Sequence, residues 1–353
     1  MQKLRINNKT IVKLPPFKVK KVVATLSEVI DWGLTQLNVP ETWLTTQGEN
    51  VTVMIIDTGW SDHEDLKEAY NNNLSKSFVT YEKNKLDGNG HSTHCQGVIG
   101  ARVNNVGIVG VAPKCNLIAI KALDSRGIGD TKWINNALKY AIEVKPDVVS
   151  MSLGSSQYDK TQHELIKELY KMNIPVICAA GNEGGANAKK NTVNYPAKLP
   201  ETISVAAFDR NGNIANFSSW GEEVDVAAPG VDIYSTWLNQ EYAMLNGTSM
   251  ATPFIAGLVA LLIAKHNKQE KETGKNDCKT VEDIRTHLTK YAHDKGEKGK
   301  DNSWGYGAID PKDSIEEPEI NTTPDVVPEI PEPPKEDNLS IWQKFWNLIC
   351  FWC

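Results

Sequence analysis

Short apolar runs and longer segments with helical periodicity alternate along most of this chain. The apolar runs cover 51–56, 117–122, 147–152, 174–180 and 202–207, and the helical patterns cover 131–144, 161–172, 248–266 and 281–290. Continuous apolar runs are typical of strands that are buried on both faces of a parallel sheet. The alternation therefore predicts an α/β fold with three layers, in which helices cover both faces of a doubly wound, mostly parallel sheet.

Composition divides the chain into four segments. Residues 1–27 carry seven Lys or Arg and no acidic residue, and residues 28–315 contain the alternating pattern. An acidic, proline-rich stretch follows over 316–340, with six Pro and eight Asp or Glu in its first 22 positions. Such a composition favours an extended linker. The last segment, 341–353, is aromatic, so we predict an extension, one main domain, a linker and a tail.

The aromatic tail has helical spacing. Trp342, Phe345, Trp346 and Ile349 recur on one helical face. Thirteen residues are too few to span a bilayer but enough to lie in its interface. Docking of the tail onto a partner protein, or back onto the main domain, is the alternative. The nearby Cys350 and Cys353 are too weak a signal for a lipidation or redox role.

Charge and cysteine usage narrow the class of protein. The formal net charge is −6, which gives no basic footprint for nucleic acid. We expect no apolar run of membrane-spanning length and no secretory leader, because Met1 to Lys21 is basic and broken by prolines. Four of the six cysteines lie far apart in the sequence. This spacing favours a reducing compartment, and hence a cytoplasmic location.

Four polar residues stand where a predicted strand or helix meets a glycine-rich turn. Asp57 ends the run that starts at Val51, His91 lies between glycines, and Asn182 follows the strand over 174–180. Ser249 begins the apolar helix over 248–266. A serine at such a place is usually only a helix cap. Because the carboxyl ends of parallel strands meet at one edge of a sheet, we expect the four side chains to converge there.

These stretches resemble the blocks of the subtilisin-like serine proteases. The blocks read D-T-G at Asp57, G-H-S-T-H at His91, A-A-G-N at Asn182 and G-T-S-M-A-T-P at Ser249, and the order Asp, His, Ser is that of subtilisins. The resemblance, which covers residues 28–315, implies a serine endopeptidase of broad specificity that acts on proteins or peptides. It implies Ser249 as nucleophile, His91 as base, Asp57 as its orienting partner and Asn182 as oxyanion donor.

Two other functional classes fit the sequence less well. A lipase-like hydrolase would need its serine before the aspartate and histidine, in a G-x-S-x-G turn. A non-enzymatic relative would be expected to lack one of the four residues, and all four are present. The sequence leaves the oligomeric state open, a homodimer included.

The resemblance also implies a substrate cleft. Its walls would be formed by two strand edges and one pocket, comprising Gly127, Ile128, Gly129, Ser152, Leu153, Gly154, Ala179, Ala180, Gly181, Glu183 and Asn194. Substrates of this family add a strand to such edges. Many relatives have a small residue where Asn194 stands. We therefore expect a shorter and more polar first pocket.

Residues 101–108 resemble the tight calcium loop of the family. The resemblance implies side-chain oxygens from Glu28, Asp65 and Asn104, and carbonyl oxygens from Arg102, Val106 and Ile108. Calcium prefers six to eight oxygen ligands, so this set is suitable for structural Ca²⁺. A plain surface turn is the alternative.

The basic extension resembles that of the intracellular branch of the family, in which a Leu-Ile-Pro-Tyr-type motif lies across the active site. Here Leu14-Pro15-Pro16-Phe17 stands at the corresponding place, with a second proline instead of isoleucine. The resemblance implies a zymogen that is cut by itself between Lys20 and Glu28. A disordered basic arm is the alternative.

Overall fold

The computed structural model describes residues 11–23, 27–71, 73–184 and 190–318. By its contacts the chain divides into two units, Met1–Glu317 and Pro318–Cys353, and the first contains all the elements discussed below. The predictions for the tail over 341–353, with Cys350 and Cys353, lie outside the described residues. They therefore stay predictions.

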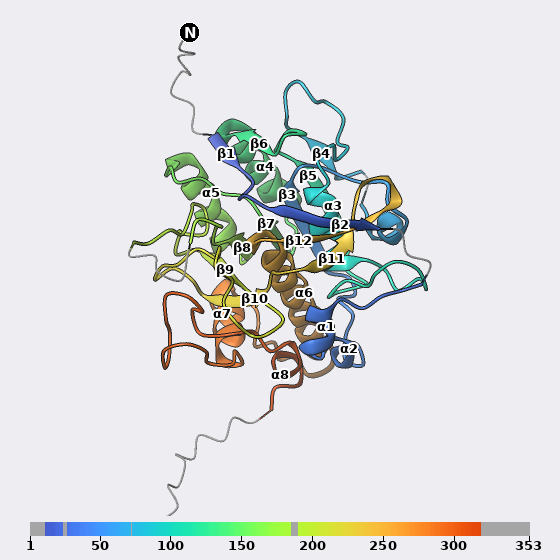
Figure 1. Cartoon of the computed structure of the whole chain (residues 1–353). Helices are drawn as coiled ribbons and strands as arrows, with labels where there is room; N and C mark the ends of the chain where they lie inside the picture. Colours follow the sequence, from blue (N-terminus) through green and yellow to red (C-terminus); the bar gives the residue numbers. More distant parts are fainter. Residues whose placement is uncertain (1–10, 24–26, 72, 185–189, 319–353) are drawn as a thin grey trace, which may run out of the picture. The chain divides into compact units, whose positions relative to one another are not determined.

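A seven-stranded sheet forms the centre of the first unit, and every pair of neighbouring strands in it is parallel. Figure 1 shows it running from β10 to β4 in the order β10-β9-β8-β7-β3-β5-β4. The bounds are β3 Thr52–Asp57, β4 Lys76–Ser77, β5 Asn116–Lys121, β7 Val148–Met151, β8 Val176–Ala179, β9 Thr202–Phe208 and β10 Val226–Pro229. Nearly all of their side chains are buried, which is why these strands read as continuous apolar runs.

The strand order puts helices on both faces. The chain runs from β3 past β5 to the edge strand β4 and returns to β5 through α3 (His91–Gly100). It then crosses over β3 to β7 through α4 (Thr131–Val144) and continues to β8 through α5 (Lys160–Lys171). Helix α3 packs against the long helix α6 (Thr248–Thr273), while α4 packs against α5. The reversal at β3 creates a switch point at its carboxyl end, where such folds bind ligands.

The predicted α/β fold is confirmed, and each predicted strand and helix has its counterpart. Helix α6 continues to Thr273, beyond the predicted end at 266, and stops at Gly274 in the left-handed region. The expectation that no segment has membrane-spanning length was wrong, because α6 is long and apolar enough to cross a membrane. However, 89% of its apolar window is buried inside the protein, so α6 is the core helix of the sheet.

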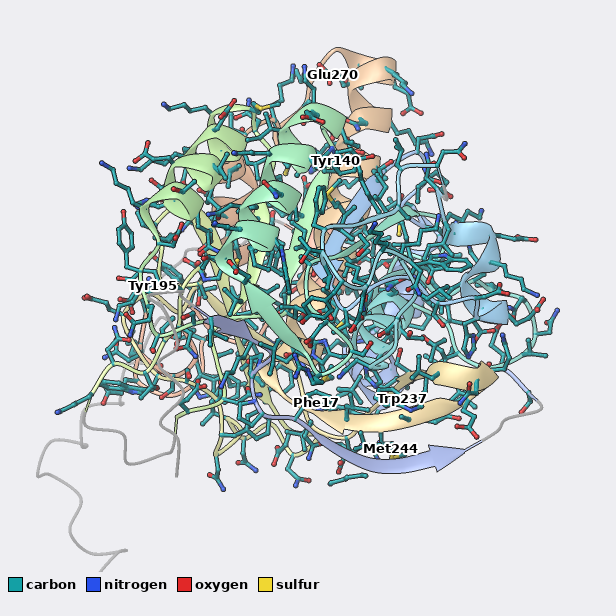
Figure 2. The ribbon with its side chains drawn as sticks, turned by 90° about the horizontal axis from the view of Figure 1, so that it is seen from above. Phe17, Tyr140, Tyr195, Trp237, Met244 and Glu270 are labelled. Atoms are coloured by element: carbon teal, nitrogen blue, oxygen red, sulfur yellow. The ribbon has the colours of Figure 1, made fainter. Side chains whose placement is uncertain are left out.

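Two small antiparallel sheets, which the periodicity did not indicate, flank the carboxyl edge. One pairs β1 (Ile11–Lys13) with β6 (Ile128–Asp130). The other has the order β11-β12-β2, from Ile233–Thr236, Tyr242–Asn246 and Lys18–Val23. Seen from above in Figure 2, β2 runs along the hairpin that carries Trp237 and Met244, and Phe17 lies at its start. The amino-terminal segment thus completes both sheets.

Short helices fill the remaining turns. They are α1 Trp32–Gln36, α2 Val39–Thr42, η1 Glu64–Ala69, η2 Leu238–Gln240, α7 Val281–Lys290 and α8 Pro311–Glu316. A capping box between Thr280 and Asp283 begins α7. Helix α8 runs through Glu316, one residue past the predicted domain boundary at 315, and the next residue, Glu317, caps it.

Candidate active site

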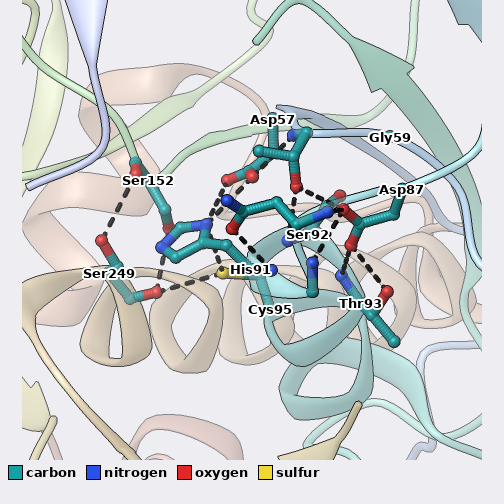
Figure 3. Close-up of polar contacts among 12 residues, drawn as sticks. Asp57, Gly59, Asp87, His91, Ser92, Thr93, Cys95, Ser152 and Ser249 are labelled. Atoms are coloured by element: carbon teal, nitrogen blue, oxygen red, sulfur yellow. Dashed lines mark hydrogen bonds and ion pairs between the residues drawn. The ribbon is translucent and has the colours of Figure 1, made fainter. Parts of the chain in front are cut away.

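A buried aspartate–histidine pair lies at the switch point. Asp57 ends β3 and His91 begins α3, and neither side chain is exposed to solvent. His91 Nδ1 lies 2.9 Å from Oδ1 and 3.0 Å from Oδ2 of Asp57 (Figure 3). Burial acts to lower the pKa of His91, but the attraction of the Asp57 carboxylate outweighs it and raises that pKa well above the usual value. The pair therefore fixes the ring through Nδ1 and leaves Nε2 facing away from the carboxylate.

Asp87 positions the turn that carries His91, and sequence reasoning missed it. Its carboxylate accepts hydrogen bonds from the Thr58 hydroxyl, the Gly90 backbone N–H and both the N–H and hydroxyl of Thr93. Gly90 has φ +98° and packs against Trp237, so a side chain there would be both strained and obstructed. The aspartate just before G-N-G-H was the available sequence signal.

Ser249 is held by the first turn of α6. Pro253, four residues further along, has no N–H, so the Ser249 carbonyl lacks its helical donor. Two side chains take that place: the Ser152 hydroxyl donates to this carbonyl at 3.0 Å and the Cys95 thiol at 3.3 Å (Figure 3). The proline in the G-T-S-M-A-T-P block thus frees an acceptor that ties α6 to β7's end and to α3.

The Ser249 hydroxyl donates to the Ser152 carbonyl oxygen at 3.3 Å. His91 Nε2 is buried and has no hydrogen-bond partner among the described residues. Where a histidine acts as a general base, its hydrogen bond to the hydroxyl often becomes short only when substrate is bound. Asp57, His91 and Ser249 thus lie together, but the hydrogen bond between the Ser249 hydroxyl and His91 Nε2 is not formed.

Asn182 follows β8 and has a fixed orientation. Its Oδ1 accepts from the Thr248 N–H at 2.9 Å and from the Thr248 hydroxyl at 2.8 Å. Because both partners are donors, the amide oxygen must face Thr248 and the Nδ2 group must face the cleft. Sequence reasoning named Asn182 but missed Thr248, which precedes the serine in the same block.

The amino-terminal segment occupies the cleft. The N–H and carbonyl groups of Lys13 pair with Gly154 at 3.0 and 2.9 Å, and the Leu14 N–H donates to Gly127 at 3.1 Å. Further along, the Pro16 carbonyl accepts from Asn182 Nδ2 at 2.8 Å. The Phe17 ring lies 5.0 Å from the His91 ring, centre to centre. Residues 11–17 therefore lie between the two predicted strand edges and cover both His91 and the Asn182 amide.

Of the predicted cleft residues, Glu183 and Asn194 line a cavity of about 810 Å³ together with Gly154 and the prolines of the segment. The Asn194 amide donates to Glu183 Oε2 at 2.7 Å, so two polar side chains are joined across this pocket. The side chains of Leu153, Ala179 and Ala180 are buried in the core instead. These three can contribute only backbone atoms or packing to the cleft.

The predicted calcium-loop residues also converge. Glu28 Oε1 accepts from the N–H groups of Asn104 and Asn105, and Asp65 Oδ1 accepts from the Asn104 side chain at 3.0 Å. Asp65 is fully buried, and among the described residues no lysine or arginine forms an ion pair with it or with Glu28. Two carboxylates that contact one tight loop and have no basic partner among the described residues form a donor set that fits a hard divalent cation.

Comparison with known proteins gives one consistent family. Residues 48–307 match the profile of the Subtilase family. The minor extracellular protease Epr of Bacillus subtilis is 36% identical over 79% of this chain and 40% of its own length. Subtilisin DY of Bacillus licheniformis is 43% identical over 62% of this chain and 79% of its own length. The intracellular serine protease of Paenibacillus polymyxa is 40% identical over 71% of this chain and 78% of its own length. The chain thus spans less than half of Epr.

The Asp57–His91 pair makes a prediction about titration. In the Ser249→Ala protein, which lacks the predicted nucleophile, His91 should stay protonated at pH values well above the ordinary pKa of histidine. Asp57→Asn removes the charge but not the burial, so the pKa of His91 should then fall below its ordinary value. Imidazole ¹⁵N NMR against pH measures this. His94, whose pKa burial lowers to about 3, is the internal control and should be neutral in both proteins. Equal titration of His91 in both would contradict the pairing.

Proposed function

The chain belongs to the subtilase family of serine endopeptidases, and on this premise we propose that Asp57, His91 and Ser249 form its catalytic triad. The observation that carries the proposal is that these three residues and Asn182 converge at one sheet edge. There His91 Nδ1 lies 2.9 Å from Asp57 Oδ1. A serine hydroxyl is a weak nucleophile at neutral pH, so it needs a base that is itself oriented by a third group. The substrates are peptide bonds of proteins.

The proposed reaction follows from the position of each group. His91 Nε2 takes the proton of Ser249 as Oγ attacks the substrate carbonyl, and later gives it to the leaving amine. Asp57 stabilises the imidazolium that forms. The Asn182 Nδ2 group and the Ser249 N–H donate to the oxyanion. Thr248 is a positioning residue, because it holds the Asn182 amide in the donating orientation before the reaction starts.

We further propose that residues 1–27 keep the enzyme inactive until they are cut. Two contacts support this: the Pro16 carbonyl takes the Asn182 donor, and Phe17 covers His91. Pro15 and Pro16 have no N–H, so the pairing with the Gly127 and Gly154 edges stops at Leu14, where a substrate could continue it. The Ser249 hydroxyl meanwhile bonds to Ser152. The segment therefore occupies the site without the hydrogen bond that activates the serine.

Calcium is proposed at the 102–108 loop. Glu28, Asp65 and Asn104 would supply side-chain oxygens, and Arg102, Val106 and Ile108 carbonyl oxygens. A bound ion would neutralise the two carboxylates and tie the start of the main domain to α3. Its contribution is structural, since it binds the native state and stabilises it by mass action.

An intracellular site of action is proposed from two observations. One relative carries the name intracellular serine protease, although another is named extracellular. The four cysteines of the described residues are free and buried, without a disulfide among them. Unpaired thiols are typical of reducing compartments.

The triad is tested by an active-site probe. A fluorophosphonate should label Ser249 of the processed enzyme and leave Ser249→Ala unlabelled. Asn182→Ala should lower kcat by roughly 10²- to 10³-fold with little change in KM, because the amide acts on the transition state. Asn116→Ala, an exposed amide on β5, is the matched control. Equal casein hydrolysis by Ser249→Ala and the parent would refute the assignment.

The inhibitory segment is tested by the kinetics of activation. Fresh full-length protein should show a lag that trace active enzyme shortens, and a protein starting at Thr25 should show none. Phe17→Ala should shorten the lag because it uncovers His91. Val19→Ala, which is exposed on the same segment, should leave it unchanged. If full-length protein has no lag and truncation adds no activity, the segment is not an inhibitor.

The calcium site is tested by chelation. In the Ser249→Ala background, Ca²⁺ at about 100 times its Kd should add about 2.7 kcal/mol to the free energy of unfolding. Calorimetry with and without chelator measures this. Asp65→Ala should abolish the calcium effect, and Asp62→Ala, an exposed carboxylate nearby, should keep it. If neither the chelator nor Asp65→Ala changes the melting temperature, the loop does not bind a structural calcium ion.

A further inference from the structure

A second group of metal-ligating side chains lies far from the catalytic residues. It joins His266 near the end of α6, Cys278 between α6 and α7, and His287 on α7, and their ligand atoms all lie within 4.8 Å of one another. His266 lies seventeen positions after Ser249 on the same helix, which corresponds to about 26 Å along α6. Figure 2 shows Glu270, one turn beyond His266, at the opposite side of the molecule from Phe17.

His266 is the least explained residue of this group. Its side chain is fully buried, and neither ring nitrogen forms a hydrogen bond among the described residues. Nε2 does lie 3.0 Å from Glu317 Oε1, but without the alignment of a hydrogen bond. Buried polar atoms without partners are rare, because they lose their bonds to water and gain nothing in return. Such an imidazole, aimed at a thiol and a second imidazole, is what a metal ion requires.

The surroundings prepare the other ligands. His287 Nε2 donates to the Ser314 carbonyl at 2.7 Å and lies 3.8 Å from Glu317 Oε1, so the lone pair of the neutral ring is on Nδ1. Metal-binding histidines commonly hold their second nitrogen in this way. Cys278 is a free thiol and 5% exposed.

We propose that His266, Cys278 and His287 bind a zinc ion, with Glu317 as the fourth ligand. Imidazole, thiolate and carboxylate are the donors that Zn²⁺ accepts in tetrahedral sites. The ligand atoms of such a site lie about 3.3–3.8 Å apart, so the side chains must close in by about an ångström. On binding, a sulfur–zinc bond forms and the thiol proton leaves to solvent. Lys265, which pairs with Glu317, must turn away from the carboxylate.

The site has an entrance. A cavity of about 490 Å³ opens beside Cys278, lined also by Ile263, Asn276 and Ile284. Of the four proposed ligands, Cys278 is the one that lines this cavity, so the thiol is the side of the site nearest to it. Once bound, it would join the end of α6, the loop before α7, α7 itself and the residue that caps α8. Glu317 is also the last residue of the first unit, so the ion would clamp the chain where the proline-rich stretch begins.

The test uses full-length Ser249→Ala with excess Ca²⁺, so that the calcium loop stays filled and the chain stays uncut. After dialysis against Zn²⁺, elemental analysis should find one zinc per chain, and zinc should raise the melting temperature by several degrees. Co²⁺ in its place should give a thiolate-to-cobalt charge-transfer band. Cys278→Ala and His287→Gln should each weaken zinc binding by more than about 10- to 100-fold.

Matched variants separate this site from others. The group Asp57, His91 and Cys95 also has metal-binding donors, so Cys95→Ala must keep the cobalt band if Cys278 is the ligand. Cys115→Ala, another buried thiol, should bind zinc like the parent. Glu317→Gln preserves the shape of the site and should weaken binding even if Cys278→Ala folds poorly. Absence of bound zinc in the parent, or an unchanged cobalt band in both Cys278→Ala and His287→Gln, would overturn the proposal.

Discussion

The arrangement of the strand end and the glycine turn at the site depends on the buried contact between Asp57 and His91. A carboxylate without solvent exposure is costly unless it is paired and hydrogen-bonded. Asp57 obtains both from its position at the end of β3, where the Thr58 N–H donates at 2.7 Å and the His91 ring approaches from the other side. The ring can reach it only because Asp87 folds the glycine turn before α3. The geometry of this candidate site is thus a consequence of satisfying one buried charge.

The cleft beside this pair presents strand edges at β6 and Gly154. Unpaired edges attract any extended segment with free N–H and carbonyl groups. Residues 11–14 take that place, and β2 then adds a strand to the hairpin on the other side. The same backbone groups that would bind a substrate therefore bind the chain's own start. Because this competition is intramolecular, a weak segment can occupy the cleft at a high effective concentration.

Helix α6 links the candidate active site to the group of His266, Cys278 and His287. Its first turn holds Ser249, whose carbonyl is freed by Pro253 and tied to Ser152 and Cys95. Its later turns carry His266 into the group with Cys278 and His287. The helix is buried along most of its length, so it is packed rigidly against the sheet. Rigid packing keeps the Ser249 end of the helix in a fixed position.

The sequence by itself determined the parallel sheet and the helices between its strands, because apolar runs are local signals. Short glycine-rich blocks, which are also local, named the four candidate residues of the site. It also indicated the basic segment around Leu14-Pro15-Pro16-Phe17. Only the tertiary structure decided that Pro16 meets Asn182, that Thr248 fixes that amide, and that His266 lies beside His287. These contacts join residues that are distant in sequence or depend on side-chain orientation. Strand order and helix packing create them, and no local pattern encodes either.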